Sequence, residues 1–279
     1  MIGALILSHG RPDRVKTVNA LKNSGFTGDI RIVCDDLDES LDAYKELYSN
    51  SVIVFDKKKK LKECDTMDNF GRTNIVLPAR NMCHEIAKSL GWDYFFELDD
   101  DYSSFNIRYA DGDKLATKNI VHMDDMLDAM IDLLEVSNAL CVCMSQSGDL
   151  MGGVESKYLK KKLSRKAMNC YVCKTSRPFV FRGTINEDVN MYVTENMIGN
   201  IVFSVTNVCC NQEVTQISKG GLTDIYLDIG TYVKSFYSVM AQPSCVTVKG
   251  MGVKDRRIHH DISWKHCSPY IISEVYKKQ

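Results

Sequence analysis

The chain has 279 residues, a hydrophobic content of 44% and a formal net charge of −1. A chain of this length and apolar content can bury a large core, so the composition excludes a disordered protein. Because 35 Lys and Arg residues balance 36 Asp and Glu residues, any site for a polyanion must be a local patch.

The cysteine pattern favours a cytoplasmic protein. The 11 cysteines are scattered, many lie inside apolar runs such as ALCVCM, and no charged-then-apolar leader follows Met1. This usage is typical of reduced thiols. No apolar run reaches the roughly 18 residues that a membrane helix needs. Cys170 and Cys173 have the spacing of half a zinc site, but no second pair lies at a suitable distance, so we interpret them as ordinary thiols.

The N-terminal segment has the pattern of a β–α–β unit. An apolar run at 2–7 leads into the turn SHGRP, a helical pattern follows, and a second apolar run at 30–34 ends at Asp35. Such a unit implies a right-handed crossover and a parallel sheet, which receives ligands at the carboxyl ends of its strands.

The same alternation continues to about residue 111. It predicts a helix at 38–48, a strand at 51–55, a helix at 77–90 and a strand at 93–99. The strand ends in LILSHG, RIVCDD and FFELDDD are polar or acidic. Because such ends converge on one edge of an open α/β sheet, we predict a nucleotide-binding half over 1–111.

Segments of β type become more frequent in the second half. A predicted helix at 123–135 precedes the strand ALCVCMSQ, and NCYVCKT, PFVFRG, NIVFSVTNVCC and PSCVTVKG also have strand character. Helices are predicted at 188–199 and 229–239. We therefore predict one α/β domain over 1–279, with a mixed, mostly parallel sheet and a Rossmann-like first half.

The acidic run Asp99, Asp100 and Asp101 directly follows the apolar strand YFFEL. Carboxylates at a strand end are solvated caps, helix-start residues or ligands of a hard divalent cation. Residues i and i+2 can reach a shared ion and a diphosphate, which suits Asp99 with Asp101, although Glu97 with Asp99 has the same spacing. We expect Asp100 to contact a ribose or point elsewhere, and to be the least costly of the three to replace.

The segment LPARNM starts the predicted helix at 77–90. Pro78 suits a helix start, so Arg80 and Asn81 lie in the first turn, where free N–H groups and the helix dipole favour anions. The alternative is a solvated arginine on a surface helix. Its position one helix before the acidic run favours contact with a diphosphate.

The pair Glu187 and Asp188 opens the next predicted helix, after the segment PFVFRGTIN. Acidic residues are common in a first helical turn. A carboxylate here can equally be the general base that deprotonates an acceptor hydroxyl. The spacing alone leaves the two interpretations even.

Two histidines, His259 and His260, follow a basic segment with glycines at 250 and 252. An imidazole can bind a metal, although a lone histidine is more often structural. Since side chains alternate along a strand, only one of the two would face the metal.

Taken together, these features resemble glycosyltransferases of the GT-A fold. More narrowly, LSHGRPDRVKT, PARN, LDDDY, RGTINEDVNMY and RRIHHDISWKH are similar to the TET/JBP-associated glycosyltransferases of bacteriophages, over about residues 1–269. That family adds sugar to hydroxymethylated pyrimidines in DNA. The resemblance implies a UDP-sugar donor, Mn²⁺ or Mg²⁺, a DNA acceptor bound by residues 112–279, and a location in the host cytoplasm.

The resemblance also assigns roles to residues. It implies a nucleotide pocket lined by Ser8, His9, Arg11 and Asp35, with Arg80 on the diphosphate and Asn81 and Asp100 beside it. It implies a metal held by Asp101, by Asp99 and by either His259 or His260. It implies Asp188, or with less support Glu187, as the catalytic base.

Other interpretations of the chain stay open. The lysine-rich tracts at 56–63 and 156–166 are solvated surface by default, but they would flank the pocket and neutralise phosphates if the acceptor is DNA. The same mechanism can act on a glycan, a protein or a small molecule. A nucleic-acid-binding module without turnover is a different class. A nucleotidyltransferase fits less well, because SHGRPDR has one glycine instead of a glycine-rich loop.

Overall fold

A mixed sheet of 10 strands runs through the protein, in the order β3-β2-β1-β4-β9-β7-β10-β5-β6, with β8 beside β10. The computed structural model describes residues 2–147, 153–156, 163–168, 170–212, 231–251 and 257–269. The strands are β1 (Ile2–Leu7), β2 (Ile30–Asp35), β3 (Val52–Phe55), β4 (Tyr94–Asp99), β5 (Tyr102–Asp111), β6 (Lys114–Asn119), β7 (Cys141–Gln146), β8 (Leu163–Ser164), β9 (Cys170–Lys174), β10 (Val202–Gln212), β11 (Val246–Met251) and β12 (Arg257–Ile262). The last two form a separate antiparallel pair.

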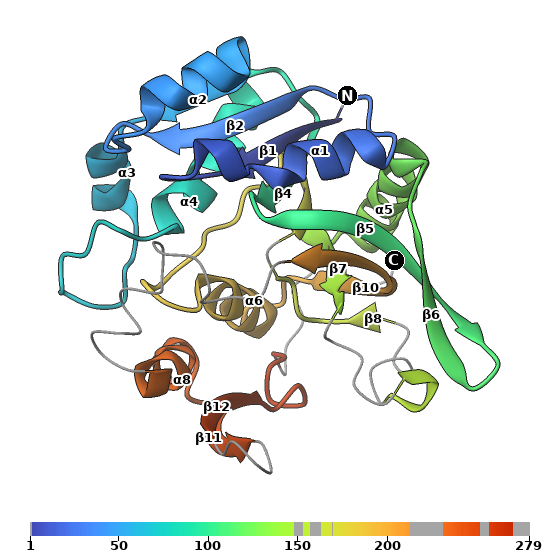
Figure 1. Ribbon diagram of the computed structural model, residues 1–279. Helices are drawn as coiled ribbons and strands as arrows, with labels where there is room; N and C mark the ends of the chain where they lie inside the picture. The colour runs from blue at the N-terminus through green and yellow to red at the C-terminus, as the bar shows by residue number, and fades with distance from the viewer. Residues whose placement is uncertain are drawn as a thin grey trace.

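The helices cover the two faces of this sheet (Figure 1). They are α1 (Lys16–Asn23), α2 (Leu41–Tyr48), α3 (Lys57–Glu63), α4 (Leu77–Ser89), α5 (Met123–Ser137), α6 (Glu187–Met197) and α8 (Thr231–Ala241), with short 3₁₀ turns η1 (Pro12–Arg14), η2 (Ser49–Ser51) and η4 (Gly153–Glu155). Among the helices of the described ranges, none is long and apolar enough to cross a membrane.

Strand β1 shows why the sheet has two cores. Its residues alternate between faces: Ala4 and Ile6 pack with residues of α1 and α5, whereas Leu5 and Leu7 pack with residues of α4 and α6. All of these strand residues are 5% exposed or less. A strand that is buried on both faces has apolar residues at successive positions, which explains the continuous apolar run in the sequence.

The first four strands in spatial order, β3, β2, β1 and β4, are parallel. Their registers align Leu7 of β1 with Val33 of β2 and with Asp99 of β4. The carboxyl ends therefore meet at one edge, as the β–α–β pattern predicts.

The remaining strands make the sheet mixed. Strand β9 runs antiparallel to β4 and β7, while β10 runs parallel to β7 and antiparallel to β5. Strands β5 and β6 form an antiparallel ribbon that projects from the body at the right of Figure 1.

One predicted strand is wrong. The segment PFVFRG, residues 178–183, contains no strand. The backbone N–H and C=O of Phe181 instead pair with the side-chain amide of Asn81, at 2.8 and 3.1 Å. This amide satisfies the polar groups that a neighbouring strand would otherwise satisfy. The other shifts are small: α6 begins at Glu187, and α8 is described from Thr231, so residues 229 and 230 of that predicted helix lie outside the described ranges.

Candidate active site

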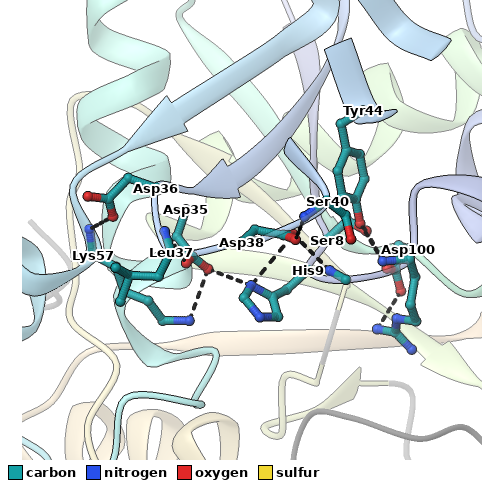
Figure 2. A network of polar contacts seen from close by, with 12 residues as sticks. Ser8, His9, Asp35, Asp36, Leu37, Asp38, Ser40, Tyr44, Lys57 and Asp100 are labelled. Carbon is teal, nitrogen blue, oxygen red and sulfur yellow. Dashed lines mark hydrogen bonds and ion pairs between the residues drawn. The ribbon is translucent and has the colours of Figure 1, made fainter. Parts of the chain in front are cut away.

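The polar residues that follow β1, β2 and β4 come together at the shared carboxyl edge, as Figure 2 shows. Ser8 directly follows β1, and its backbone N–H donates to the carbonyl of Val33 at 3.2 Å. Gly10 has a φ of +69°, a conformation that glycine adopts without strain, so the chain turns sharply after the strand. This turn directs Ser8, His9 and Arg11 toward the ends of β2 and β4.

We call Ser8, His9, Arg11, Asp35, Asp38, Tyr44, Lys57 and Asp100 the nucleotide-side cluster. Asp35 is its centre on the β2 side: His9 Nδ1 and Lys57 Nζ each lie 2.9 Å from Asp35 Oδ2. Burial opposes ionisation of Asp35, but hydrogen bonds from His9 and Lys57 outweigh it, so the pKa of this carboxyl is lowered. Asp38 accepts from the N–H of Gly10 at 2.7 Å and thereby fixes the turn.

Asp100 anchors the same cluster from the β4 side. Ser8 Oγ donates to Asp100 Oδ2 at 2.6 Å and also lies 2.6 Å from the hydroxyl of Tyr44. Arg11 pairs with the other oxygen at 2.9 Å. Burial is the main reason that the pKa of Asp100 is raised to about 6, because Arg11 and Ser8 offset it only in part. Asp100 is 2% exposed, so its burial argues against the expectation that it is the least costly aspartate to replace, which stays a prediction.

Arg80 contacts three carboxylates in this structure, and its expected contact with a diphosphate stays a prediction. Its Nε lies 2.9 Å from Glu187, and its two terminal nitrogens lie 3.0 Å from Glu97 and from Asp99. The side chain is 3% exposed and also lies over the rings of Tyr171 and Phe181. A guanidinium enclosed in this way joins α4, β4 and α6.

Asn81 is likewise a structural residue in this structure. Its amide pairs with both backbone groups of Phe181 and so ties α4 to the segment before α6. Pro78 lies in the first turn of α4, as predicted, and Arg80 and Asn81 follow it. Both side chains point into protein instead of extending from the helix start toward a ligand.

Asp101 differs from its two neighbours. Its Oδ2 accepts from Gln212 at 3.3 Å, and Gln212 accepts in turn from Gln146 at 3.1 Å. Its Oδ1 is buried and has no hydrogen-bond partner among the described residues. Burial, and then the charges of Asp99 and Asp100, raise the pKa of Asp101 to about 7. The hydrogen bond from Gln212 and the charge of Arg11 offset this rise only in part.

An uncompensated carboxylate oxygen suits a divalent cation, which prefers oxygen ligands. Within the described ranges, however, no group of three or more His, Cys, Asp or Glu residues is arranged to hold a metal. Asp99 is engaged by Arg80, so Asp101 is the aspartate whose chemistry best fits a metal ligand.

The two histidines form a stacked pair on β12, with ring centroids 4.1 Å apart. His260 Nδ1 is buried without a partner in the described part of the chain. Burial, followed by the charge of His259, lowers the pKa of His260 to about 4, so this imidazole is neutral at pH 7. The described residues do not gather these rings with two or more further ligand-type side chains.

The first turn of α6 separates the two candidate bases. Glu187 is 5% exposed and its carboxylate is held by Arg80. Asp188 is 8% exposed, and burial, followed by the charge of Glu187, raises its pKa to about 6. A carboxylate with this pKa can accept a proton near neutral pH, so Asp188 fits the base better than Glu187 does.

Several residues of the site were not predicted: Tyr44, Lys57, Asp38, Gln146 and Gln212. Lys57 was part of a tract interpreted as solvated surface, yet its side chain is 6% exposed. The available signal was its position directly after β3, at the same sheet edge as Asp35. The glutamines gave no signal, because their pairing depends on the register between β7 and β10.

The chain is similar to one protein family and to several solved structures. The model of a family described as TET-Associated Glycosyltransferase matches residues 3–221. No curated protein matches the chain. Solved structures with a distant likeness include S. aureus TarS, with 10% identity and a TM-score of 0.43, and the match covers 81% of this chain but 38% of TarS. A second is glucosyl-3-phosphoglycerate synthase from Mycobacterium tuberculosis, with 9% identity, a TM-score of 0.41 and coverage of 94% and 87%.

The family match spans the nucleotide-side cluster, the acidic run and the first turn of α6. It therefore includes nearly every predicted site residue, with the histidines of β12 outside it. The chain therefore belongs to the TET-associated glycosyltransferase family, and its fold is α/β with a mixed sheet.

Proposed function

We propose that this glycosyltransferase moves a sugar from a UDP-sugar to the hydroxymethyl group of 5-hydroxymethylpyrimidines in DNA, with Mn²⁺ or Mg²⁺. The observation that carries the proposal is the buried carboxylate edge, where Asp101 has an oxygen without a partner among the described residues. This oxygen lies on the residue next to Asp100, which belongs to the nucleotide-side cluster. The arrangement suits a cation bound together with a diphosphate.

The nucleotide-side cluster would bind the donor. Ser8, His9, Arg11 and Asp35 lie at or just after the carboxyl ends of β1 and β2, where parallel sheets receive nucleotides. The side chains of His9 and Arg11 are 43% and 35% exposed, so both can turn toward a ligand. Asp35 pairs with His9, and Asp100 pairs with Arg11.

The metal would be held by Asp101, with Asp99 and one of His259 or His260 as further candidate ligands. When bound, such a cation neutralises charge that develops on the diphosphate leaving group. Gln212 orients Asp101 through its hydrogen bond to Oδ2 and leaves Oδ1 for the ion.

Asp188 would act as the general base, with Glu187 as the less favoured candidate. The acceptor hydroxyl gives its proton to Asp188, its oxygen bonds to the anomeric carbon, and the bond from that carbon to the diphosphate breaks. A pKa of about 6 leaves most of the Asp188 carboxylate ionised at pH 7. Arg80 holds Glu187 next to it and thereby fixes the start of α6.

A nucleotide-sugar donor and a DNA acceptor also indicate a cytoplasmic location. All 11 cysteines are free thiols, which suits a reducing compartment.

The test is incubation of the purified protein with Mn²⁺, labelled UDP-glucose or UDP-GlcNAc, and either hydroxymethylated or plain DNA. We expect transfer to the hydroxymethylated DNA alone, with the product identified by mass spectrometry of the nucleosides. The Asp188→Asn variant serves as the inactive control. Absence of transfer from each of several donors would refute the proposal.

A glycan, a protein or a small molecule is the alternative acceptor. The net charge of −1 favours this alternative, because the chain has no global attraction to a polyanion. Parallel reactions with these acceptors separate the two cases. Transfer to DNA should also weaken steeply as salt rises, since phosphate contacts release counterions.

A further inference from the structure

Helix α8 exposes an apolar stripe to solvent. Tyr232, Phe236 and Met240 are 64%, 50% and 54% exposed, and their spacing of four residues puts them on one face of the helix. The opposite face is anchored, because Ser235, Tyr237 and Ser238 are 2% exposed or less. Large apolar side chains that are exposed together on one face mark an interaction surface.

This stripe lies on a helix that is tied to the candidate catalytic base. Asn186, which precedes Glu187 and Asp188, donates to the carbonyl of Lys234 at 2.7 Å and to Ser238 Oγ at 3.2 Å. Figure 1 shows α8 directly below α6. The hydrogen bonds of Asn186 therefore place α8 beside the first turn of α6, which carries the candidate base.

A second exposed aromatic residue belongs to the segment between α3 and α4. Phe70 is 62% exposed, and the guanidinium of Arg72 lies 6.0 Å from the centre of its ring. Tyr237 of α8 donates a hydrogen bond of 2.6 Å to Asp68 in the same segment. We call Phe70, Tyr232, Phe236 and Met240 the aromatic surface.

The charge of this region favours an anionic partner. The described residues at 231–251 and 257–269 contain four basic residues (Lys234, Lys249, Arg257 and Lys265) and one acidic residue, Asp261, which is a net charge of +3. The whole chain has a net charge of −1, so positive charge is concentrated around α8 and the β11–β12 hairpin. Aromatic side chains within a basic region are typical of sites for single-stranded nucleic acid.

We propose that the aromatic surface stacks unpaired bases of the DNA acceptor beside the catalytic base, an inference that rests on the proposed function. A sugar can be added to a base only when the reacting group leaves the helix stack, and the neighbouring bases then lose stacking partners. The rings of Tyr232, Phe236 and Phe70 replace those partners without reading the sequence. The basic residues of the region attract the phosphates.

The test measures binding of an unmodified single-stranded oligonucleotide, which accepts no sugar. Removal of both exposed rings of α8 in Y232A/F236A should weaken binding at least tenfold, since each stacked base contributes a factor of about five or more. The slope of affinity against salt should stay the same, because no phosphate contact is removed. Both positions are exposed, so the thermal midpoint should change little.

The matched controls are Leu47→Ala on α2 and Val136→Ala on α5, whose side chains are 57% and 90% exposed. Both variants should bind the oligonucleotide as the wild type does. Wild-type affinity in Y232A/F236A would overturn the inference. So would a wild-type dimer that this variant converts to a monomer, because the stripe would then be a contact between two copies.

The two proposals fail separately. Binding of the oligonucleotide through α8 without sugar transfer would leave the aromatic surface supported and refute the proposed acceptor. Transfer to hydroxymethylated DNA with equal kcat/KM in wild type and Y232A/F236A would support the proposed function and refute the aromatic surface.

Discussion

The hydrogen bonding of the nucleotide-side cluster differs from that of Asp101, Asp188 and His260, which we call the acceptor side of the site. In the cluster, Asp35 and Asp100 each have at least two partners, and the turn after β1 is fixed by Asp38. On the acceptor side, Asp101 Oδ1 and His260 Nδ1 are buried without a partner among the described residues. One region is complete without a ligand and the other is not.

This difference indicates where a ligand contributes most to the structure. A buried polar atom without a hydrogen bond costs free energy and persists when a bound partner satisfies it in the working state. Burial is the main reason that the pKa values of Asp101 and Asp188 are raised, to about 7 and about 6, as it is for Asp100 in the cluster. We therefore expect the nucleotide-side cluster to be preformed and the acceptor side to be completed by metal and substrates.

The largest expected effect comes from Arg80, which joins β4 to the start of α6. Arg80→Met would leave Glu97, Asp99 and Glu187 without their shared cation in a buried site. The free energy of unfolding should fall by about 3–5 kcal/mol, the range for loss of one partner of a buried ion pair. Urea denaturation monitored by circular dichroism measures the change.

The matched control is Arg31→Met, because Arg31 pairs with Asp29 at 2.8 Å with both side chains partly exposed. An exposed pair contributes less than about 1 kcal/mol. Similar losses in the two variants would contradict the central role of Arg80.

The second prediction concerns the base. Asp188→Asn should lower kcat by about 100-fold or more with little change in the thermal midpoint, because the amide keeps the shape but cannot accept the proton. Glu187→Gln should mainly lower the midpoint, since Arg80 loses one of its partners. The reverse result would assign the base to Glu187.

The pH dependence of kcat tests the same assignment. Burial and the charge of Glu187 raise the pKa of Asp188 to about 6. The base is active when it is ionised, so kcat should rise tenfold per pH unit below about 6 and level off above it. A flat profile between about pH 5 and 7 would argue against Asp188.

The third prediction contrasts two adjacent aspartates. Asp100→Asn should lower the free energy of unfolding by about 1–3 kcal/mol, because Arg11 and Ser8 lose a charged partner. Asp101→Asn removes an uncompensated charge and should leave the stability of the metal-free protein unchanged or higher, while kcat with Mn²⁺ falls. Equal destabilisation by Asp100→Asn and Asp101→Asn would contradict the difference between the nucleotide-side cluster and the acceptor side.

The sequence predicted the parallel half of the fold well. Strands β1, β2 and β4 are buried on both faces, so each appears as an apolar run with a polar end, and these ends mark the nucleotide edge. Ser8, His9, Arg11, Asp35 and Asp100 do come together there. The apolar runs and their polar ends are local signals, so they can be recognised without knowledge of the tertiary packing.

The roles of individual side chains were harder to predict. Arg80 has the pattern of an anion-binding residue, yet three carboxylates from β4 and α6 enclose it, and only tertiary packing brings them together. The β5–β6 ribbon was also missed, although the two-residue Gly-Asp loop at 112–113 between alternating residues is typical of a hairpin.

The smallest expected effect tests whether the nucleotide-side cluster is complete without a ligand. Asp35→Asn removes the charge that Lys57 and His9 share, and it should lower the free energy of unfolding at pH 7 by about 1–2 kcal/mol. The folded protein holds the pKa of Asp35 below its usual value, so the stabilisation is present above the unfolded pKa of about 3.9 and is lost as pH falls through the folded value. The stability curves of wild type and variant should therefore converge as pH falls below about 4. Urea denaturation without donor or metal measures both curves. A difference that appears only when the donor is added would mean that the ligand completes this cluster too, and the two regions would then not differ.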